Sequence, residues 1–119
     1  MSDEQSIIID ILKIVPDNSI CYINAPNIDS DSSILKLLTS ATEYDWSIIL
    51  TLDKKKLLTS IITTESIQDC FHRLDIKFTN SLLCESYDGM CTVILSDNLN
   101  IPKWFTDKYV KDGLTWNMK

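Results

Sequence analysis

The chain has 119 residues, enough for one hydrophobic core but short for two ordinary domains, so residues 1–119 are expected to form a single globular domain. Its hydrophobic fraction of 45% and charged fraction of 24% are those of an average folded protein and exclude an intrinsically disordered chain. The formal net charge of −6 argues against nucleic-acid binding, because that binding depends on Lys and Arg side chains at the phosphates.

No targeting or membrane signal is recognisable. Residues 1–5 lack the basic and apolar regions of a secretory signal peptide, and no apolar run approaches the length of a membrane span. We therefore expect a cytoplasmic protein with no membrane partner, in which the four cysteines are free thiols. Because the cysteines form no C-x-x-C pair and the chain has one histidine, neither a metal site nor a cofactor is predicted.

The first two elements are predicted to be a helix and a strand. Ser2 and Gln5 fit a capping box, and apolar residues recur at helical spacing over residues 7–15 until Pro16 ends the helix. Residues 19–24 are rich in β-branched and aromatic side chains, which predicts a short strand.

A polar loop joins this strand to a second predicted helix. Asp29 and Asp31 form a D-x-D pair, but the loop lacks the further oxygen ligands and the glycine of a calcium-binding loop. Asp31 or Ser32 is expected to cap a helix that runs to about residue 41. Residues 46–52 then have the composition and length of a strand.

Two assignments fit residues 57–63. Their apolar positions fit a helical stripe, but their Thr and Ile content favours a strand, with residues 53–56 as the turn before it. Thr63 or Thr64 is then expected to cap a helix that ends near Leu74. In that helix His72 lies on the exposed side, and residues 75–79 follow as one more short strand.

The clearest structural signal is the pair Asp88-Gly89, which lies between two apolar runs. Both residues tolerate the positive φ of a type I′ turn, so residues 82–96 are predicted to form a hairpin with a two-residue loop, in which Cys84 lies opposite Val93. Alternation along the two strands predicts a core face of Leu82, Cys84, Ser86, Cys91, Val93 and Leu95, and a mixed face of Leu83, Glu85, Tyr87, Met90, Thr92 and Ile94.

The last helix is predicted between Pro102, which suits a first helical turn, and Gly113, which suits the left-handed position after a helix end. Residues 114–118 alternate as in an edge strand or an extended tail. An aromatic stripe expected to pack in the core consists of Ile101, Trp104, Phe105 and Tyr109. The predicted order of elements is α-β-α-β-β-α-β-β-β-α, so the fold class is α+β, with a mainly antiparallel sheet of about five to six strands and about three to four packed helices.

Sequence motifs of enzymes are missing. The chain has two glycines, Gly89 and Gly113, and so has no P-loop, no G-x-G-x-x-G and no nucleophile elbow. With His72 as its one histidine it has few general bases. We expect a protein that is not an enzyme and has no catalytic residues.

Acidic residues are concentrated in the first part of the chain. Residues 1–53 carry nine Asp and Glu against two Lys, a balance of −7, whereas residues 54–119 carry eight acidic against nine basic residues, a balance of +1. Such an acidic surface repels phosphate backbones and attracts a basic partner. We expect a protein partner and no nucleic acid.

In its small size, its acidity and its Ile- and Asp-rich composition, the chain resembles the immunity proteins that bacteria make against secreted toxins, many of which are basic nucleases. The acidic stretch from Asp29 to Asp53, with Tyr44 and Trp46 inside it, carries most of this resemblance. It implies a cytoplasmic inhibitor that neutralises a cognate basic toxin or nuclease domain. The partner-binding face is expected to consist of Asp29, Asp31, Glu43, Tyr44, Asp45, Trp46, Glu85, Tyr87 and Asp88.

An alternative is a small acidic secretion-chaperone-like or regulatory module. Such a module would form a homodimer through its apolar strands or through the helix that contains Trp104. The molar mass in solution distinguishes this alternative from a monomer that pairs with a toxin.

Overall fold

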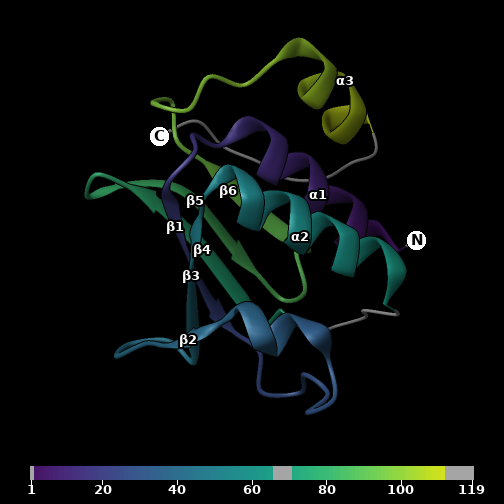
Figure 1. The fold of residues 1–119 in the computed structure, drawn as a ribbon. Coiled ribbons are helices and arrows are strands. Elements are labelled where there is room, and N and C mark those ends of the chain that lie inside the picture. The colour runs from purple at the N-terminus through teal and green to yellow at the C-terminus, as the bar shows by residue number, and fades with distance from the viewer. Residues whose placement is uncertain (1, 66–70, 112–119) are drawn as a thin grey trace.

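The computed structural model describes residues 2–65 and 71–111 of the chain (Figure 1). The strands are β1 (Ser19–Asn24), β2 (Thr39–Ser40), β3 (Trp46–Leu50), β4 (Arg73–Phe78), β5 (Ser81–Tyr87) and β6 (Thr92–Leu95). They form one antiparallel sheet in the order β2-β3-β1-β4-β5-β6. The helices are α1 (Asp3–Ile14), α2 (Leu52–Thr64) and α3 (Lys103–Lys111), with a short 3₁₀ helix η1 (Ser33–Leu37).

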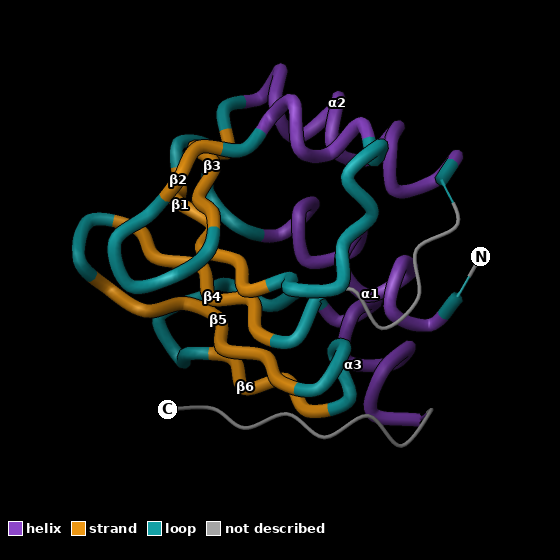
Figure 2. The backbone as a smooth tube through the Cα atoms, turned by 90° about the horizontal axis from the view of Figure 1, so that it is seen from below, coloured by secondary structure: helices purple, strands orange, loops and turns teal. Residues whose placement is uncertain are grey.

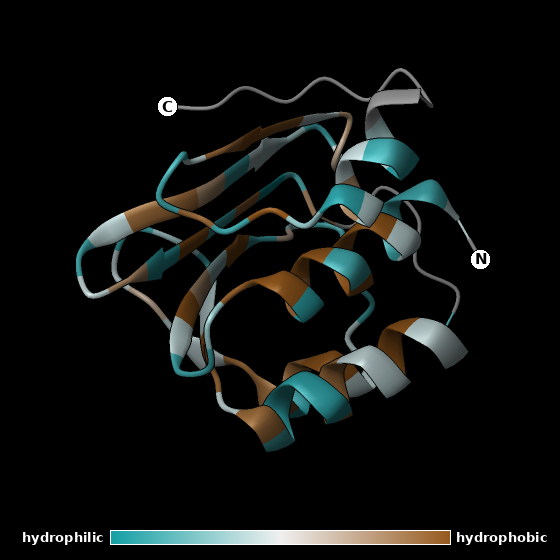
Figure 3. Ribbon diagram, turned by 90° about the horizontal axis from the view of Figure 1, so that it is seen from above, coloured by the Kyte–Doolittle hydropathy of each residue, from teal (hydrophilic) through white to brown (hydrophobic). Residues whose placement is uncertain are grey.

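The sheet has one face covered by helices and one face free of them (Figure 2). In β1, Cys21 and Ile23 are buried towards the helices, whereas Ile20 and Tyr22 alternate with them on the opposite side. Hydrophobic residues occur along α1, α2 and the strands that they cover (Figure 3). The predicted α+β class, the element order and the mainly antiparallel sheet are therefore confirmed.

Helix α1 begins at the predicted capping box. The Gln5 backbone N–H donates to Ser2 Oγ at 3.2 Å, and the Ser2 backbone N–H donates to Gln5 Oε1 at 2.8 Å. The Gln5 side-chain amide also donates to the carbonyl oxygens of Ile62 and Glu65, at 2.5 and 2.8 Å. Gln5 thus caps its own helix and satisfies carbonyl groups at the C-terminal end of α2.

Residues 52–64 form helix α2, so the predicted turn at 53–56 and strand at 57–63 are wrong. Thr51 caps the helix, since its Oγ1 accepts from the Lys54 backbone N–H at 3.2 Å. Leu58 and Ile62, four residues apart, are the buried positions of this helix. Burial at helical spacing outweighs the β propensity of the Thr and Ile residues, which is weaker than tertiary packing.

The helix predicted to end near Leu74 is also wrong in its described part. Strand β4 begins at Arg73, and Leu74 is buried within this strand. Much of that predicted helix falls on residues 66–70, which lie outside the described residues. The helix predicted before residue 41 is η1, which Ser32 caps as expected and which ends after Leu37.

The loop of the hairpin formed by β5 and β6 is two residues longer than predicted, which shifts the register of the two strands. Cys84 lies opposite Leu95, and residues 88–91 form the loop. The Asp88 and Gly89 backbone N–H groups donate to the carbonyl oxygens of residues 72 and 71, both at 3.0 Å, so these two residues extend the pairing towards the segment before β4. Three consecutive residues of the loop have positive φ: Asp88 at 54°, Gly89 at 65° and Met90 at 68°.

This register changes which side chains of the hairpin are buried. Cys84, Ser86, Val93 and Leu95 are buried as predicted, but Cys91 is exposed and Met90 is 2% exposed. A register shift after Ile76 also places Leu83 in the core, in place of Leu82. The two-residue turn with positive φ at both central positions joins β4 to β5 instead, at Thr79 and Asn80.

Helix α3 packs on α1 through aromatic and charged side chains. Phe105 is fully buried and Tyr109 is 6% exposed, as the predicted stripe requires, whereas Trp104 is 44% exposed. The Tyr109 hydroxyl and the Lys108 ammonium both donate to Oδ2 of Asp10 in α1, Lys108 at 2.8 Å. The predicted cap at Gly113 and the alternating residues 114–118 lie outside the described residues.

The Asp10 contact makes the docking of α3 sensitive to acid. Burial alone would raise the pKa of Asp10, but hydrogen bonds from Lys108 and Tyr109 and the nearby positive charge of Lys108 hold the pKa below its ordinary value. A carboxyl group with a lowered folded-state pKa stabilises the fold above its unfolded pKa, about 3.9, and loses this contribution as the pH falls further.

We expect Asp10→Asn to lower the free energy of unfolding at pH 7 by about 1.5–3 kcal/mol, because hydrogen bonds to a charged group are lost. The difference between wild type and variant should shrink as the pH falls below about 4. Urea unfolding of both proteins between neutral and acidic pH measures this difference. A difference that stays constant with pH would contradict the assigned ionic contact.

Candidate functional site

The helix-free face of the sheet, called the open face below, carries three rows of side chains that follow from the strand registers. Residues directly opposite each other in antiparallel strands point to the same side of the sheet. The aliphatic row consists of Ile49, Ile20, Lys77 and Leu82. The middle row consists of Ser47, Tyr22, Asp75, Glu85 and Ile94. The third row, at the end of β1 and the start of β4, consists of Asn24, Arg73, Tyr87 and Thr92.

Asp75 lies at the centre of the open face and is nevertheless only 1% exposed. Tyr44, from the loop before β3, covers it: the Tyr44 hydroxyl donates to Asp75 Oδ2 at 2.5 Å. The Arg73 guanidinium binds the same carboxylate through Nη2 at 3.0 Å and Nε at 3.1 Å. Tyr22 packs on the ring of Tyr44, with centroids 5.0 Å apart. The buried carboxylate is thus paired and hydrogen-bonded, as a buried charge requires.

Burial, together with the hydrogen bond to Asp75, raises the pKa of Tyr44 to about 12. Tyr44 therefore stays a protonated hydrogen-bond donor at neutral pH. Its donation to Asp75 fixes the loop that precedes β3 against the sheet.

Arg73 connects this centre to the hairpin strands. Its guanidinium lies 4.9 Å from the ring centroid of Tyr87 and 6.0 Å from that of Tyr44. Arg73 Nη2 is 3.8 Å from Glu85 Oε2, which also accepts from the Tyr87 hydroxyl at 2.7 Å. The hydrogen bond with Asp75 raises the pKa of Arg73, and the hydrogen bond with Glu85 raises the pKa of Tyr87. These contacts form a connected network of charged groups and aromatic rings on the open face.

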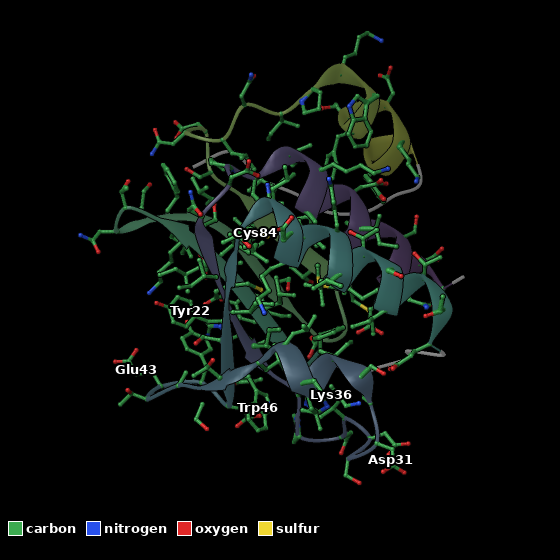
Figure 4. All side chains as sticks on the ribbon, viewed as in Figure 1. Tyr22, Asp31, Lys36, Glu43, Trp46 and Cys84 are labelled. Carbon is green, nitrogen blue, oxygen red and sulfur yellow. The ribbon has the colours of Figure 1, made fainter. Side chains whose placement is uncertain are left out.

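The antiparallel order brings the predicted acidic residues to one end of the sheet. β1 and β5 end there, and β3 and β4 begin there, so residues 25–32, 41–45, 71–72 and 88–91 form what is called the loop end below. Figure 4 shows that Glu43 and Asp31 lie on opposite sides of this end. Asp29, Asp31, Glu43, Tyr44, Asp45 and Asp88 belong to the loop end, whereas Trp46, Glu85 and Tyr87 lie in the adjoining strands, so the nine predicted residues do not form one continuous patch.

An open hollow of about 540 Å³ lies at the loop end beside Tyr44, lined by Asn24, Pro26, Thr42, Glu43, Tyr44, Asp45 and His72. Asp45 holds its rim in place: Asp45 Oδ2 accepts from the Ala25 backbone N–H at 3.0 Å, and the Asp45 backbone N–H donates to Asn24 Oδ1 at 2.8 Å. Glu43 is exposed. The loop thus presents two neighbouring carboxylates from a backbone that is fixed at both Tyr44 and Asp45.

The remaining predicted residues occupy other positions. Asp29 Oδ1 accepts from the Asp31 backbone N–H at 3.0 Å, which makes a local turn near η1. Trp46 lies opposite buried Ile23, on the helix side of the sheet, and packs partly buried against the core. Asp88 is exposed in the hairpin loop.

Sequence reasoning missed the residues that organise the open face. Arg73, Asp75 and Lys77 alternate with Leu74 and Ile76, a strand pattern that was present in the sequence. The pattern was divided between a predicted helix that ends near Leu74 and a predicted strand at residues 75–79, so Arg73 was not recognised as part of the same strand as Asp75. The exposed side chain of Ile49, and Tyr22 beside it, were likewise not among the predicted partner-binding residues.

Among the described residues, the cysteines Cys21 and Cys84 are buried. Burial raises the pKa of the Cys21 and Cys84 thiols, so both stay protonated. Within residues 2–65 and 71–111, no three His, Cys, Asp or Glu side chains lie close enough to hold a metal ion. Aromatic and Arg side chains, such as those of the open face, are enriched in protein–protein interfaces.

No protein-family model matches the chain, and no curated protein or solved structure is significantly similar to it. Of the helices in the described part, none is long and apolar enough to cross a bilayer.

Proposed function

We propose that this chain is a protein-binding module of the immunity type, which neutralises a cognate basic toxin or nuclease domain through its acidic loop end. The observation that carries the proposal is the anchored loop with Glu43 and Asp45, tied to the sheet by the Tyr44 hydroxyl and by the Asp45 carboxylate. Carboxylates on a loop that is already ordered bind a cation with a smaller loss of conformational entropy than carboxylates on a mobile loop would.

Acidic and basic side chains are concentrated on different surfaces of the protein. The loop end carries the exposed carboxylates of Asp29, Asp31, Glu43, Asp45 and Asp88. The cluster Lys54, Lys55 and Lys56 lies on α2, on the helix side of the sheet. A basic partner is attracted to the first surface and repelled by the second, which favours approach to the loop end.

The test is affinity capture of the tagged protein from its own cells at low salt. We expect the wild type to retain one abundant basic partner, and a loop-end variant with Asp29→Asn, Asp31→Asn, Glu43→Gln and Asp45→Asn to lose about 90% or more of it, because charge complementarity dominates such encounters. The matched control removes four charges elsewhere, with Asp17→Asn, Asp53→Asn, Asp97→Asn and Asp107→Asn. Equal retention by the two variants would contradict the proposed surface.

A second candidate, the dimerising chaperone-like or regulatory module, is favoured by the exposed side chain of Ile49 on the open face. Light scattering of the purified protein separates the two candidates. The immunity-type function predicts a monomer of 13.6 kDa in the absence of a partner. A stable dimer would favour the second candidate.

A further inference from the structure

The aliphatic row of the open face has no role in the acidic binding surface proposed above. Ile49 is 56% exposed, the largest exposed fraction among the large hydrophobic side chains in the described part of the chain. Ile20 lies directly opposite it in β1, and Tyr22 follows in the next row. Exposed aliphatic and aromatic side chains that adjoin a charged rim are typical of the centre of a protein–protein interface.

Charge indicates which face a basic partner selects. A groove of about 460 Å³ between α1 and α2, on the helix side, also has an exposed hydrophobic residue, Leu52, but its charged lining is Lys13, Lys55 and Lys56 against one acid, Asp17. Lys13 pairs with Asp10 and Lys55 with Asp17, yet the lining keeps an excess of positive charge. A basic partner is repelled there. The open face instead continues along β3 from Ile49 to the carboxylates of Asp45 and Glu43, and its own cations have partners: Arg73 is paired with Asp75, and Lys77 lies over the ring of Tyr22.

Charge also argues against a second copy of the chain as the occupant of this face. Each copy carries a formal net charge of −6, so two copies repel each other. A basic protein has the complementary charge. Ile49 lies three residues, about 10 Å, from the start of β3, and Asp45 immediately precedes that strand, so an aliphatic side chain and a Lys or Arg on one short segment of a partner span the distance.

We propose that the open face is the docking surface for a basic protein segment, with an aliphatic side chain of that segment on Ile49 and Ile20 and its Lys or Arg side chains at Glu43 and Asp45. This inference rests on the proposed function and adds the apolar half of the partner's surface. It makes Ile49 the anchor of the complex, and it requires the partner to lie across the sheet rather than on α1 and α2.

The experiment uses a synthetic amphipathic helical peptide, with leucine on one face and arginine on the other, titrated at low salt into the isotopically labelled full chain. We expect amide shifts at residues 20–22 and 43–49. We expect Ile49→Asp to weaken binding by about tenfold or more, because a buried aliphatic contact is lost. The control Leu57→Asp, at a site on α2 that is 50% exposed, should change affinity less than about twofold.

Four outcomes would overturn the inference or the function beneath it. Shifts confined to the loop end, with no effect of Ile49→Asp, would overturn the apolar anchor but leave the acidic surface in place. Shifts at α1 and α2 would overturn the choice of face, and a wild-type dimer that Ile49→Asp dissociates would identify a second copy as the occupant. Binding that is unchanged by the loop-end variant would overturn the proposed function itself.

Ile49→Ser and a thermal unfolding curve of each variant guard against loss of the fold.

Discussion

Replacement of Asp75 by alanine is expected to lower the free energy of unfolding by about 3 kcal/mol, because it removes a buried carboxylate that accepts hydrogen bonds from two side chains. Asp75 is 1% exposed and accepts hydrogen bonds from both Tyr44 and Arg73. The loop before β3 should also detach from the sheet, since the Tyr44 hydroxyl loses its acceptor. Urea unfolding measures the stability, and amide shifts of residues 41–45 report the loop.

Asp75→Asn is the matched control for this prediction. The amide keeps an oxygen acceptor for Tyr44 but removes the charge that pairs with Arg73, so it should cost less stability than the alanine and leave the loop closer to the sheet. If Asp75→Ala were as stable as the wild type, the central position of this carboxylate on the open face would be contradicted.

Ile62→Ala is expected to destabilise the protein by about 2–5 kcal/mol, through lost hydrophobic transfer energy and the cavity that it leaves. Ile62 is fully buried in α2 and faces the core that includes Ile8 and Ile76. Leu57→Ala in the same helix is the control, with an expected change within about 0.5 kcal/mol because Leu57 is 50% exposed. Equal effects at the two positions would contradict the orientation of α2.

The elements that could be predicted from the sequence are those in which local signals and tertiary packing agree. Residues 3–14 have a capping box, an apolar stripe and a terminating proline, and they form α1 as expected. For residues 52–64 the two sequence signals disagree: the Thr and Ile content favours a strand, whereas Leu58 and Ile62 have helical spacing. Local propensity is the weaker term when a buried face is available.

The hairpin illustrates a second limit of local reasoning. The pair Asp88-Gly89 has the positive φ that a tight turn needs, yet its backbone N–H groups bond to residues 71 and 72 instead of closing a two-residue loop. The pairing of a distant segment decides the register. No signal within residues 82–96 contains that information.

The candidate site was predicted only in part, because its contacts also join segments that are distant in the sequence. Tyr44, Glu85 and Tyr87 were selected for charge and aromatic character, and the fold brings them together around Arg73 and Asp75. Trp46 was included in the predicted partner-binding face, whereas it lies on the core side, as its alternation with Ile48 and Leu50 along β3 indicates. The contact of Asp75 with Tyr44 spans 31 positions and depends on the order of the strands.

The most direct test of the central claim is the association rate constant between this chain and its captured basic partner, measured over a range of salt concentrations for the wild type and the loop-end variant. The account predicts a wild-type rate that falls steeply as salt is added, and a variant rate about tenfold or more slower at low salt with little further dependence on salt. A wild-type rate that does not respond to salt, or a variant rate equal to that of the wild type, would contradict an acidic loop end as the surface that recruits the partner.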